Sequence, residues 1–179
     1  MIRLFAAIAI PADIGAELAA RQHGLRGARW RPPEAFHVTL RFFGDVAEDR
    51  ARDLDEALLA LHGAPLALAL EGVGAFGEGH DIHALWAGVV ENPDLRRLAG
   101  RCERTARAAG LAPEPRTYRP HVTLAYTRRP DPEAVAAWIS QNGLLRSPTF
   151  TADRVGLYSS WRTSEGSRYR LEAGYPLVG

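Results

Sequence analysis

The chain of 179 residues contains no lysine, so arginine supplies all 22 of its basic side chains. This absence excludes every mechanism that depends on a lysine, from Schiff bases to nucleotidyl-lysine intermediates. With 21 acidic residues the formal net charge is only +1. Proteins that coat long nucleic acids usually carry an obvious basic excess, so this charge leaves room for no more than a local anion site.

Cysteine occurs once, as Cys102. A single cysteine excludes both a disulfide framework and a cysteine-based metal cluster. Cys102 falls on the apolar side of a predicted helix, where a buried structural thiol is favoured over a nucleophile.

Long apolar runs are also missing, since none approaches the ~20 residues that span a bilayer. The opening residues MIRLFAAIAIPADIG are too short for a signal peptide and lack its cleavage site. We interpret residues 2–9 as the first strand and expect a cytoplasmic protein without membrane association. The hydrophobic fraction of 46% is enough for a real core, in one domain or two small lobes.

Apolar periodicity, capping residues and turn signals predict mixed secondary structure without strict alternation of strands and helices, which indicates the α+β class. Helices are expected over 13–23, up to Gly63, from Asn92-Pro93 to Gly110, and from Asp131-Pro132 to Gly143. Strands are expected over 36–43, 65–76, 83–90 and 120–127, with two closing strands within 147–160 and 167–177.

The tetrapeptide His-Val-Thr-Leu occurs twice, at 37–40 and 121–124, an offset of 84 residues. A proline-containing segment precedes each copy, and a capped helix followed by strands comes after it. The period of this weak internal repeat is too long for a solenoid, so the repeat indicates two related lobes.

Each copy is half apolar and half polar when it is extended. Alternation places His37 and Thr39 on one face of their strand, with Val38 and Leu40 on the other. His121 and Thr123 share a face in the same way. Plain alternation also places Phe42 opposite His37, so we expect Phe42 to pack in the core.

Two histidines and two threonines around one cleft suit phosphodiester chemistry without a metal. A neutral imidazole can take a proton from water while a protonated one donates to the leaving oxygen. An unperturbed pKa of about 6.5 would let both forms coexist near neutral pH. Threonine hydroxyls can hold the phosphate oxygens between them. A histidine on a strand is often merely structural, so the spacing alone leaves both roles open.

Other polar groups receive weaker interpretations. His80, Asp81 and His83 lie in a turn with no second ligand cluster, so we predict no metal site there. Four arginines precede the motif strands. Each one alone is most simply a solvated surface residue, whereas together they predict a basic rim that attracts anions. They are Arg29, Arg31, Arg116 and Arg119. Trp30, Phe42 and Tyr118 are candidates for stacking on a base, although alternation favours core packing for Phe42.

The two motifs, in this order and with these flanks, resemble the two-histidine (2H) phosphoesterase superfamily. The segments RLFAAIAIP, RWRPPEAFHVTLRFFGDV, YRPHVTLAYTRR and VGLYSSWRTSEGSRYRLEAGYPL carry the likeness over nearly the whole chain. Within the superfamily they are most similar to the RNA 2′,3′-cyclic phosphodiesterases, formerly called 2′-5′ RNA ligases. The resemblance implies a single bilobed domain over 1–179, with two pseudo-twofold-related antiparallel sheets forming a central cleft and helices outside.

The resemblance also implies the chemistry. His37 would be the general acid for the leaving 3′ oxygen and His121 the base that activates water, while Thr39 and Thr123 position the phosphate. The substrates would be RNA ends or short oligonucleotides carrying a 2′,3′-cyclic phosphate, hydrolysed to 2′-phosphomonoesters by a monomer that needs no metal or nucleotide cofactor. The reverse ligation would be minor.

One position departs from the family pattern. Members often carry an arginine after the second Leu-Ala, where this chain has Tyr126, and arginines follow only at 128 and 129. Arg119, Tyr126 and Arg128 therefore stand as candidate substrate contacts without a role carried over. Two alternatives stay open: a non-catalytic module that binds RNA ends, and a 2H esterase for another cyclic phosphate.

Overall fold

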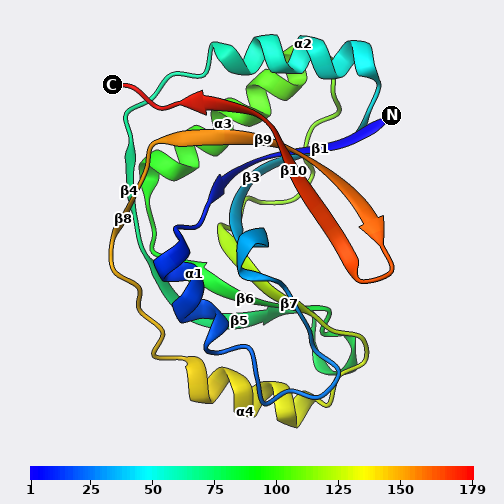
Figure 1. The fold of residues 1–179 in the computed structure, drawn as a ribbon, viewed down its shortest axis with the longest axis vertical. Coiled ribbons are helices and arrows are strands. Elements are labelled where there is room, and N and C mark those ends of the chain that lie inside the picture. Colours follow the sequence, from blue (N-terminus) through cyan, green and yellow to red (C-terminus); the bar gives the residue numbers. More distant parts are fainter.

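In the computed structural model, which describes residues 1–179, six elements of the first half recur in the same order in the second (Figure 1). The first set is β1 (Ile2–Ala9), α1 (Ala12–Ala19), β3 (His37–Val46), α2 (Glu48–Leu59), β4 (Leu66–Leu68) and β5 (Leu70–Phe76). The second is β6 (Ala84–Val89), α3 (Pro93–Ala108), β7 (His121–Tyr126), α4 (Pro132–Asn142), β8 (Phe150–Ala152) and β9 (Arg154–Thr163). Four of the six pairs begin 84 residues apart, so the predicted internal repeat is confirmed.

The remaining elements lie outside the repeat. They are the short strand β2 (Arg29–Trp30), the last strand β10 (Gly166–Pro176), and two single-turn 3₁₀ helices at Pro33–Ala35 and Gly79–Asp81. None of the helices is long and apolar enough to cross a membrane.

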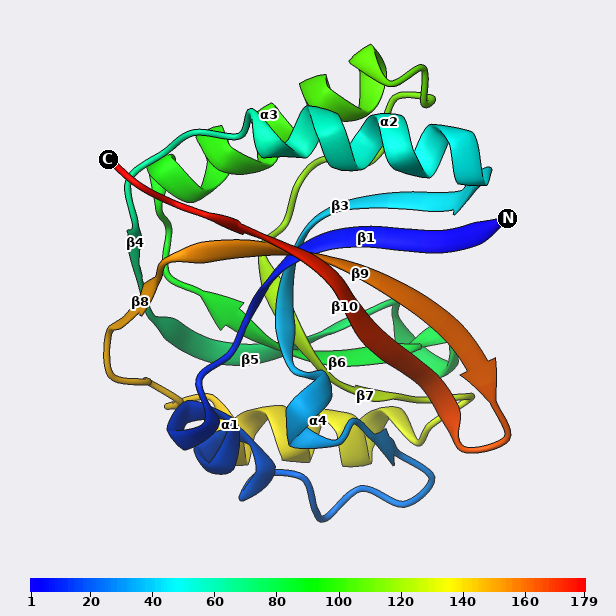
Figure 2. The same ribbon diagram turned by 45° about the horizontal axis from the view of Figure 1, so that its top comes forward.

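The main sheet is antiparallel, and equivalent strands of the two repeats occupy equivalent places on either side of its centre. Its strand order is β10-β9-β1-β3-β7-β6-β5, with β2 added to β7. The third strand of each half comes from the other repeat, because β5 pairs with β6 and β9 pairs with β1. The chain crosses from one half to the other at β4 and again at β8, and these two strands pair with each other in a separate two-stranded sheet. Figure 2 shows these crossings at one edge of the molecule.

The helices cover the outside of the two halves, so the expected α+β architecture is confirmed. Helices α2 and α3 lie together over the half that contains β1 and β3, while α1 and α4 lie at the opposite end of the molecule, beside β5 to β7 (Figure 1). Leu54 and Leu58 bury the inner face of α2, and Trp138 anchors α4. Cys102 of α3 is buried as predicted, and its burial raises the pKa of the thiol to about 12.

Local signals predicted the later helices well. The side chain of Asn92 accepts hydrogen bonds from the backbone N–H groups of Asp94 and Leu95, and Gly110 follows α3 with a positive φ of 79°. The Asp131 carboxylate caps α4 in the same manner.

Other helix and strand boundaries differ from those predicted from the sequence. The first helix ends at Ala19 rather than near residue 23, and the carbonyl of Arg21, just beyond it, accepts a hydrogen bond from Trp138 Nε1. The predicted strand 65–76 is divided, since β4 and β5 pair in different sheets. Helix α2 ends before Leu61, so Gly63 is not its cap.

Both motif strands carry a β-bulge at the same place. The pairing of β1 with β3 skips Leu40, and the pairing of β6 with β7 skips Leu124. A bulge reverses the alternation of faces beyond it. The expectation that Phe42 packs in the core is therefore wrong, because its side chain is 46% exposed on the polar face of the motif.

Candidate active site

The two motifs meet at the centre of the main sheet. Strands β3 and β7 are joined there by one residue pair, Val38 with Val122. Antiparallel register at this pair sets His37 across from Thr123 and Thr39 across from His121. The structure thus brings the two predicted His/Thr pairs together, although 84 residues separate them in the chain.

Both imidazoles are oriented by the same local hydrogen bond. Nδ1 of His37 lies 2.8 Å from the carbonyl oxygen of Ala35, and Nδ1 of His121 lies 2.7 Å from that of Arg119. A carbonyl can only accept, so each Nδ1 carries the proton and donates it. Nε2 of each ring has no partner in the protein and is the atom available for proton transfer.

The two motif threonines are half-buried, and neither hydroxyl makes a hydrogen bond within the protein. Thr127, which follows the second motif, differs because its hydroxyl donates to the carbonyl of Ile82 at 2.8 Å. The hydroxyls of Thr39 and Thr123 are therefore free to donate to a ligand.

His37 lies among aromatic rings. Its ring centroid is 4.8 Å from that of Phe5 and 5.3 Å from that of Tyr169, which meets it edge-on. Burial and, to a lesser degree, the positive charges of Arg31 and His121 lower the pKa of His37 to about 4, against the opposing effect of the Ala35 hydrogen bond. The effect of His121 places the two imidazoles within electrostatic reach of each other.

His121 is the more accessible of the pair. Phe76 meets its ring edge-on at 4.8 Å. Burial is again the main reason that the pKa of His121 is lowered, opposed by the hydrogen bond to Arg119. The expectation of unperturbed values near 6.5 is therefore wrong for both histidines.

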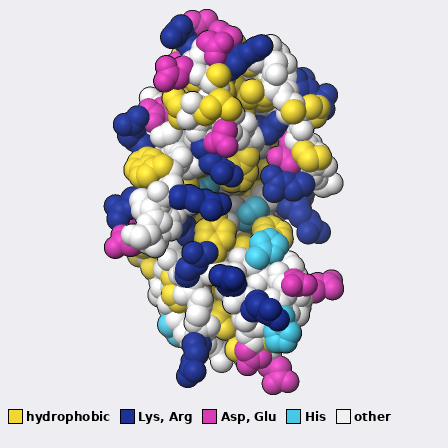
Figure 3. All heavy atoms as spheres, turned by 90° about the vertical axis from the view of Figure 1, so that its right-hand side faces the viewer, with side chains coloured by type: hydrophobic (Ala, Val, Ile, Leu, Met, Phe, Trp, Pro, Cys, Tyr) yellow, Lys and Arg dark blue, Asp and Glu magenta, His cyan; other side chains and the backbone are white.

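A cavity of about 910 Å³ opens on the motif face. We call it the main cleft. Its walls include a motif residue from each half, three further aromatic rings and several arginines, and Figure 3 shows a hollow holding histidine side chains with arginines around it. His37 and Thr123 are not in this lining. The lining residues are Thr39, Leu40, Arg41, Phe42, Phe76, Gly77, His83, Arg96, Ala99, Gly100, Glu103, Glu114, Arg116, Thr117, Tyr118, Arg119 and His121.

One wall of the main cleft is fixed by a buried ion network. Arg41, 8% exposed, pairs through Nε with Glu103, lies 3.7 Å from the Glu114 carboxylate, and donates to the carbonyl of Ala112 at 2.6 Å. Burial alone would raise the pKa of Glu103, but hydrogen bonds from Arg107 and Arg41 hold it below its usual range. The network ties the segment before the second motif to β3.

The three candidate substrate contacts lie in different environments. Arg119 is exposed and lines the main cleft beside His121. Tyr126 is half-buried, with the guanidinium of Arg31 5.8 Å from its ring centroid. Arg128 is exposed beyond β7 and is not part of the cleft lining.

Several residues differ from their sequence-based interpretation. Arg31 is no solvated rim residue, because its side chain is only 7% exposed. Trp30 packs on Trp138, at 5.9 Å between rings, instead of facing the main cleft. Phe76 and Tyr169 contact the two histidines, and no local sequence pattern marks either residue.

His80 lies in the 3₁₀ turn Gly79–Asp81, and His83 follows two residues after it. No group of three or more histidine, cysteine or acidic side chains is arranged to hold a metal ion. Nδ1 of His80 lies 3.2 Å from the carbonyl of Pro130. His83 stacks on Phe76 at 6.3 Å and lines the main cleft.

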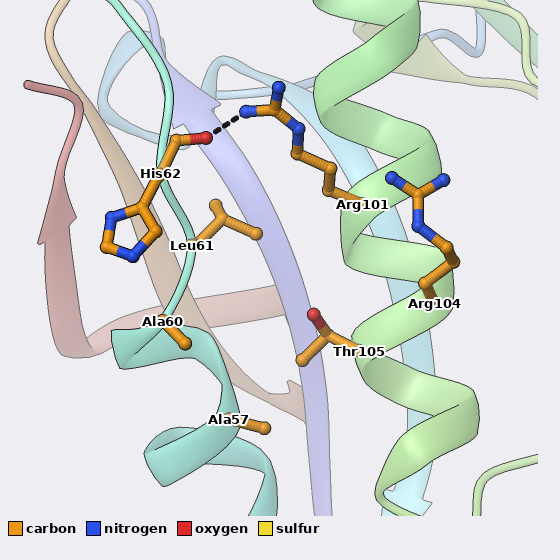
Figure 4. A pocket seen from close by; sticks show the side chains of 7 residues that line it. All are labelled: Ala57, Ala60, Leu61, His62, Arg101, Arg104 and Thr105. Atoms are coloured by element: carbon orange, nitrogen blue, oxygen red, sulfur yellow. Dashed lines mark hydrogen bonds between the residues drawn. The ribbon is translucent and has the colours of Figure 1, made fainter. Parts of the chain in front are cut away.

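A smaller cavity of about 390 Å³ lies between α2 and α3 (Figure 4). Arg101 reaches across it and donates to the carbonyl of His62. It holds a single imidazole and lies apart from the motifs, so it offers no pair of proton-transfer groups. Its lining is Ala57, Ala60, Leu61, His62, Arg101, Arg104 and Thr105.

Comparison with known proteins gives consistent matches. Residues 11–163 match the model of the 2′-5′ RNA ligase superfamily. A Geobacillus stearothermophilus protein named RNA 2′,3′-cyclic phosphodiesterase is 30% identical over 84% of this chain, but the match spans only 48% of that relative. An Aeropyrum pernix protein of the same name is 38% identical over 51% of this chain and 53% of its own length. A Methanocaldococcus jannaschii relative, also so named, is 27% identical over 95% of this chain and 98% of its own.

Solved structures share the fold. E. coli LigT in complex with 3′-AMP aligns with a TM-score of 0.81 at 22% identity, covering 99% of both chains. A Thermus thermophilus protein aligns with a TM-score of 0.81 at 23% identity over 98% of both chains.

Proposed function

The chain belongs to the 2′-5′ RNA ligase superfamily, and on this basis we propose that it hydrolyses 2′,3′-cyclic phosphates at RNA or nucleotide ends to 2′-phosphomonoesters. One observation carries the proposal. Two imidazoles are held by matching carbonyl contacts with Nε2 free, beside two threonine hydroxyls that lack protein partners. These groups can act as a general acid and a general base on either side of one phosphate.

In the proposed reaction, Nε2 of His121 takes a proton from water as the water oxygen attacks phosphorus. The bond from phosphorus to the 3′ oxygen breaks, and Nε2 of protonated His37 donates its proton to that oxygen. The products are a 2′-phosphomonoester and a free 3′ hydroxyl. Exchange with solvent then returns His121 to its neutral form and His37 to its protonated form. The reaction needs no metal or nucleotide cofactor.

The low pKa of His37 sets a condition on this assignment. In the free protein His37 is neutral at pH 7, because burial and nearby positive charge disfavour its protonated form. A bound phosphodiester carries one negative charge and raises the pKa of the imidazole beside it. The acid is therefore formed on substrate binding.

The main cleft suits a short RNA end. Thr39 and Thr123 would donate to the non-bridging oxygens of the phosphate, and the exposed Arg119 would meet a neighbouring one. Phe42 and Phe76 offer stacking faces for bases. All these residues come from one chain, so the proposal requires only a monomer, and we place it in the cytoplasm. The reverse reaction, with a ribose hydroxyl in place of water, would be minor because bulk water favours hydrolysis.

The test uses the full chain with adenosine 2′,3′-cyclic phosphate and with an RNA oligonucleotide that ends in a cyclic phosphate, in the presence of EDTA. Product position is read by phosphorus NMR. We expect His37→Ala and His121→Ala each to lower kcat by about 10² to 10⁴ with the melting temperature retained. His62→Ala, an exposed histidine at the smaller cavity, is the matched control and should keep full activity.

Other outcomes would contradict the proposal. Unchanged turnover in either motif variant would remove the acid–base mechanism. Tight binding of the cyclic or 2′-phosphate end without turnover would identify a binding module instead. Activity confined to other cyclic phosphates would point to a different esterase, and loss in EDTA would overturn metal independence.

A further inference from the structure

Only two charged side chains of the chain are buried, Arg31 and Arg41. They have the same residue type and nearly the same exposed fraction, but opposite surroundings. Arg41 is neutralised by Glu103 and Glu114. Arg31 has no carboxylate within ion-pair distance. A buried charge is normally paired, so Arg31 is a cation without its counter-ion.

The position of Arg31 is nevertheless firmly defined. The backbone N–H of Arg31 donates to the carbonyl of Leu124 at 2.8 Å, and Gln22 Nε2 donates to the carbonyl of Arg31 at 2.7 Å. These bonds fix β2 beside the second motif. The guanidinium lies close to two phenol rings, 5.8 Å from the centroid of Tyr126 and 5.2 Å from that of Tyr169.

Most of the donors of Arg31 remain unused. A guanidinium has five N–H groups, and within this protein Nη2 donates to the carbonyl of Ser167 at 2.8 Å and the side chain also donates to the Tyr169 hydroxyl. The Tyr126 and Tyr169 rings also stabilise the cation, and they leave the remaining N–H groups of the guanidinium unused. The fork is therefore oriented in advance and still able to bind a planar pair of oxygen atoms.

Arg31 also lies next to the chemistry. Tyr169 contacts it on one side and meets His37 edge-on at 5.3 Å on the other. The charge of Arg31 is one reason that the pKa of His37 is low, in keeping with a guanidinium close to that imidazole. The missing counter-ion would thus be bound beside His37.

We propose that Arg31 is the anion-binding residue of the site, and that its unpaired guanidinium binds the non-bridging oxygens of the substrate's phosphate. The inference rests on the proposed function and adds a residue that the two motifs do not contain. As water adds to phosphorus, further negative charge develops on those oxygens. A fixed cation is then worth more in the transition state than in the ground state, so Arg31 acts mainly on kcat.

The experiment compares Arg31→Met and Arg31→Lys with Arg52→Met in the full chain. Arg52 is exposed on α2, outside the main cleft and without an ion pair, so Arg52→Met removes the same charge from a remote position. We expect Arg31→Met to lower kcat for adenosine 2′,3′-cyclic phosphate by about 10² to 10³, with a smaller rise in KM. It should also weaken binding of adenosine 2′-monophosphate at least about tenfold. Arg31→Lys should recover part of both losses, and Arg52→Met should change neither.

A measurement on the unsubstituted protein guards against misfolded variants. Titration with inorganic phosphate, followed by ¹⁵N NMR of arginine Nε–H groups, should shift the Arg31 resonance in a saturable manner. A resonance that stays in place while phosphate saturates the protein would overturn the inference, as would Arg31→Met with unchanged kcat and product affinity.

The two proposals fail in different ways. If the wild type turns over and both histidine variants are inactive, but Arg31→Met behaves like Arg52→Met, the role of Arg31 is wrong and the proposed function stands. If the wild type does not hydrolyse any cyclic phosphate, the proposed function is wrong. Phosphate binding by Arg31 is then decided by the NMR titration alone.

Discussion

The ring of His37 meets the ring of Tyr169 edge-on, with 5.3 Å between centroids. Tyr169 comes from β10, which lies outside the internal repeat at one edge of the main sheet, and no strand lies in the equivalent place beyond β5. His121 contacts Phe76 instead and remains more open to the main cleft. The last strand thus breaks the symmetry of the two motifs. Two histidines in identical tetrapeptides receive different environments, as an acid and a base require.

The pH dependence of kcat/KM follows from those environments. This quantity reports the free enzyme, and catalysis requires one imidazole protonated and the other neutral. Burial lowers the pKa of His37 to about 4 and also lowers that of His121, so above pH 6.5 both are neutral. We expect kcat/KM to be greatest between pH 4 and 6.5 and to fall as the pH rises beyond it. Initial rates at subsaturating substrate measure this, and an optimum above pH 7.5 would contradict it.

The same burial links stability to pH. The folded-state pKa of His37 is below its unfolded value of 6.5, so its contribution to stability is complete above pH 6.5 and declines as the pH falls towards 4. Between pH 6.5 and 5 the loss amounts to at most about 2 kcal/mol. We expect the free energy of unfolding of His37→Gln to fall by correspondingly less over this pH interval. Urea unfolding at the two pH values measures it, and parallel losses in both proteins would show that His37 is not buried as described.

The threonine hydroxyls separate catalysis from folding. Thr39→Val and Thr123→Val remove hydroxyls that have no protein partner, so each should lower kcat by about 10-fold or more and leave the melting temperature unchanged. Thr127→Val is the opposite case, because it leaves the buried carbonyl of Ile82 without its donor. That variant should lose about 1 to 3 kcal/mol of unfolding free energy and keep its kcat. Thermal unfolding with steady-state kinetics on all three variants tests this, and a reversed pattern would show that the motif hydroxyls are structural.

Local sequence determined the parts of the fold that depend on local interactions. The caps at Asn92 and Asp131 and the faces of the HVTL strands were predictable, because each is set by residues within a few positions. The burial of Arg31 was not. It requires β2 to pair with β7 and the β9–β10 hairpin to bring Tyr169 and Ser167 over it, from more than 130 residues away.

The bulges were unpredictable for a related reason. Leu40 and Leu124 are ordinary strand residues. Each is bulged because consecutive residues of the neighbouring strand, β1 or β6, pair with the residues immediately before and after it. Their effect on the site is large, since they turn the side chains five residues after each motif histidine, Phe42 and Tyr126, back to the polar face.

Adjacent phenylalanines test the first bulge directly. Phe43 is 8% exposed within the core, whereas Phe42 is 46% exposed and lines the main cleft. Phe43→Ala should cost about 3 to 5 kcal/mol of unfolding free energy with little change in KM. Phe42→Ala should cost far less and raise KM for a cyclic-phosphate oligonucleotide by about 5-fold or more, because a stacking face is lost.

Chemical unfolding and steady-state kinetics on this pair distinguish the two arrangements of β3. Without the bulge, plain alternation would bury Phe42 and expose Phe43, and the two effects would exchange. A large stability loss in Phe42→Ala together with a raised KM in Phe43→Ala would therefore refute the bulge. It would also remove Phe42 from the main cleft.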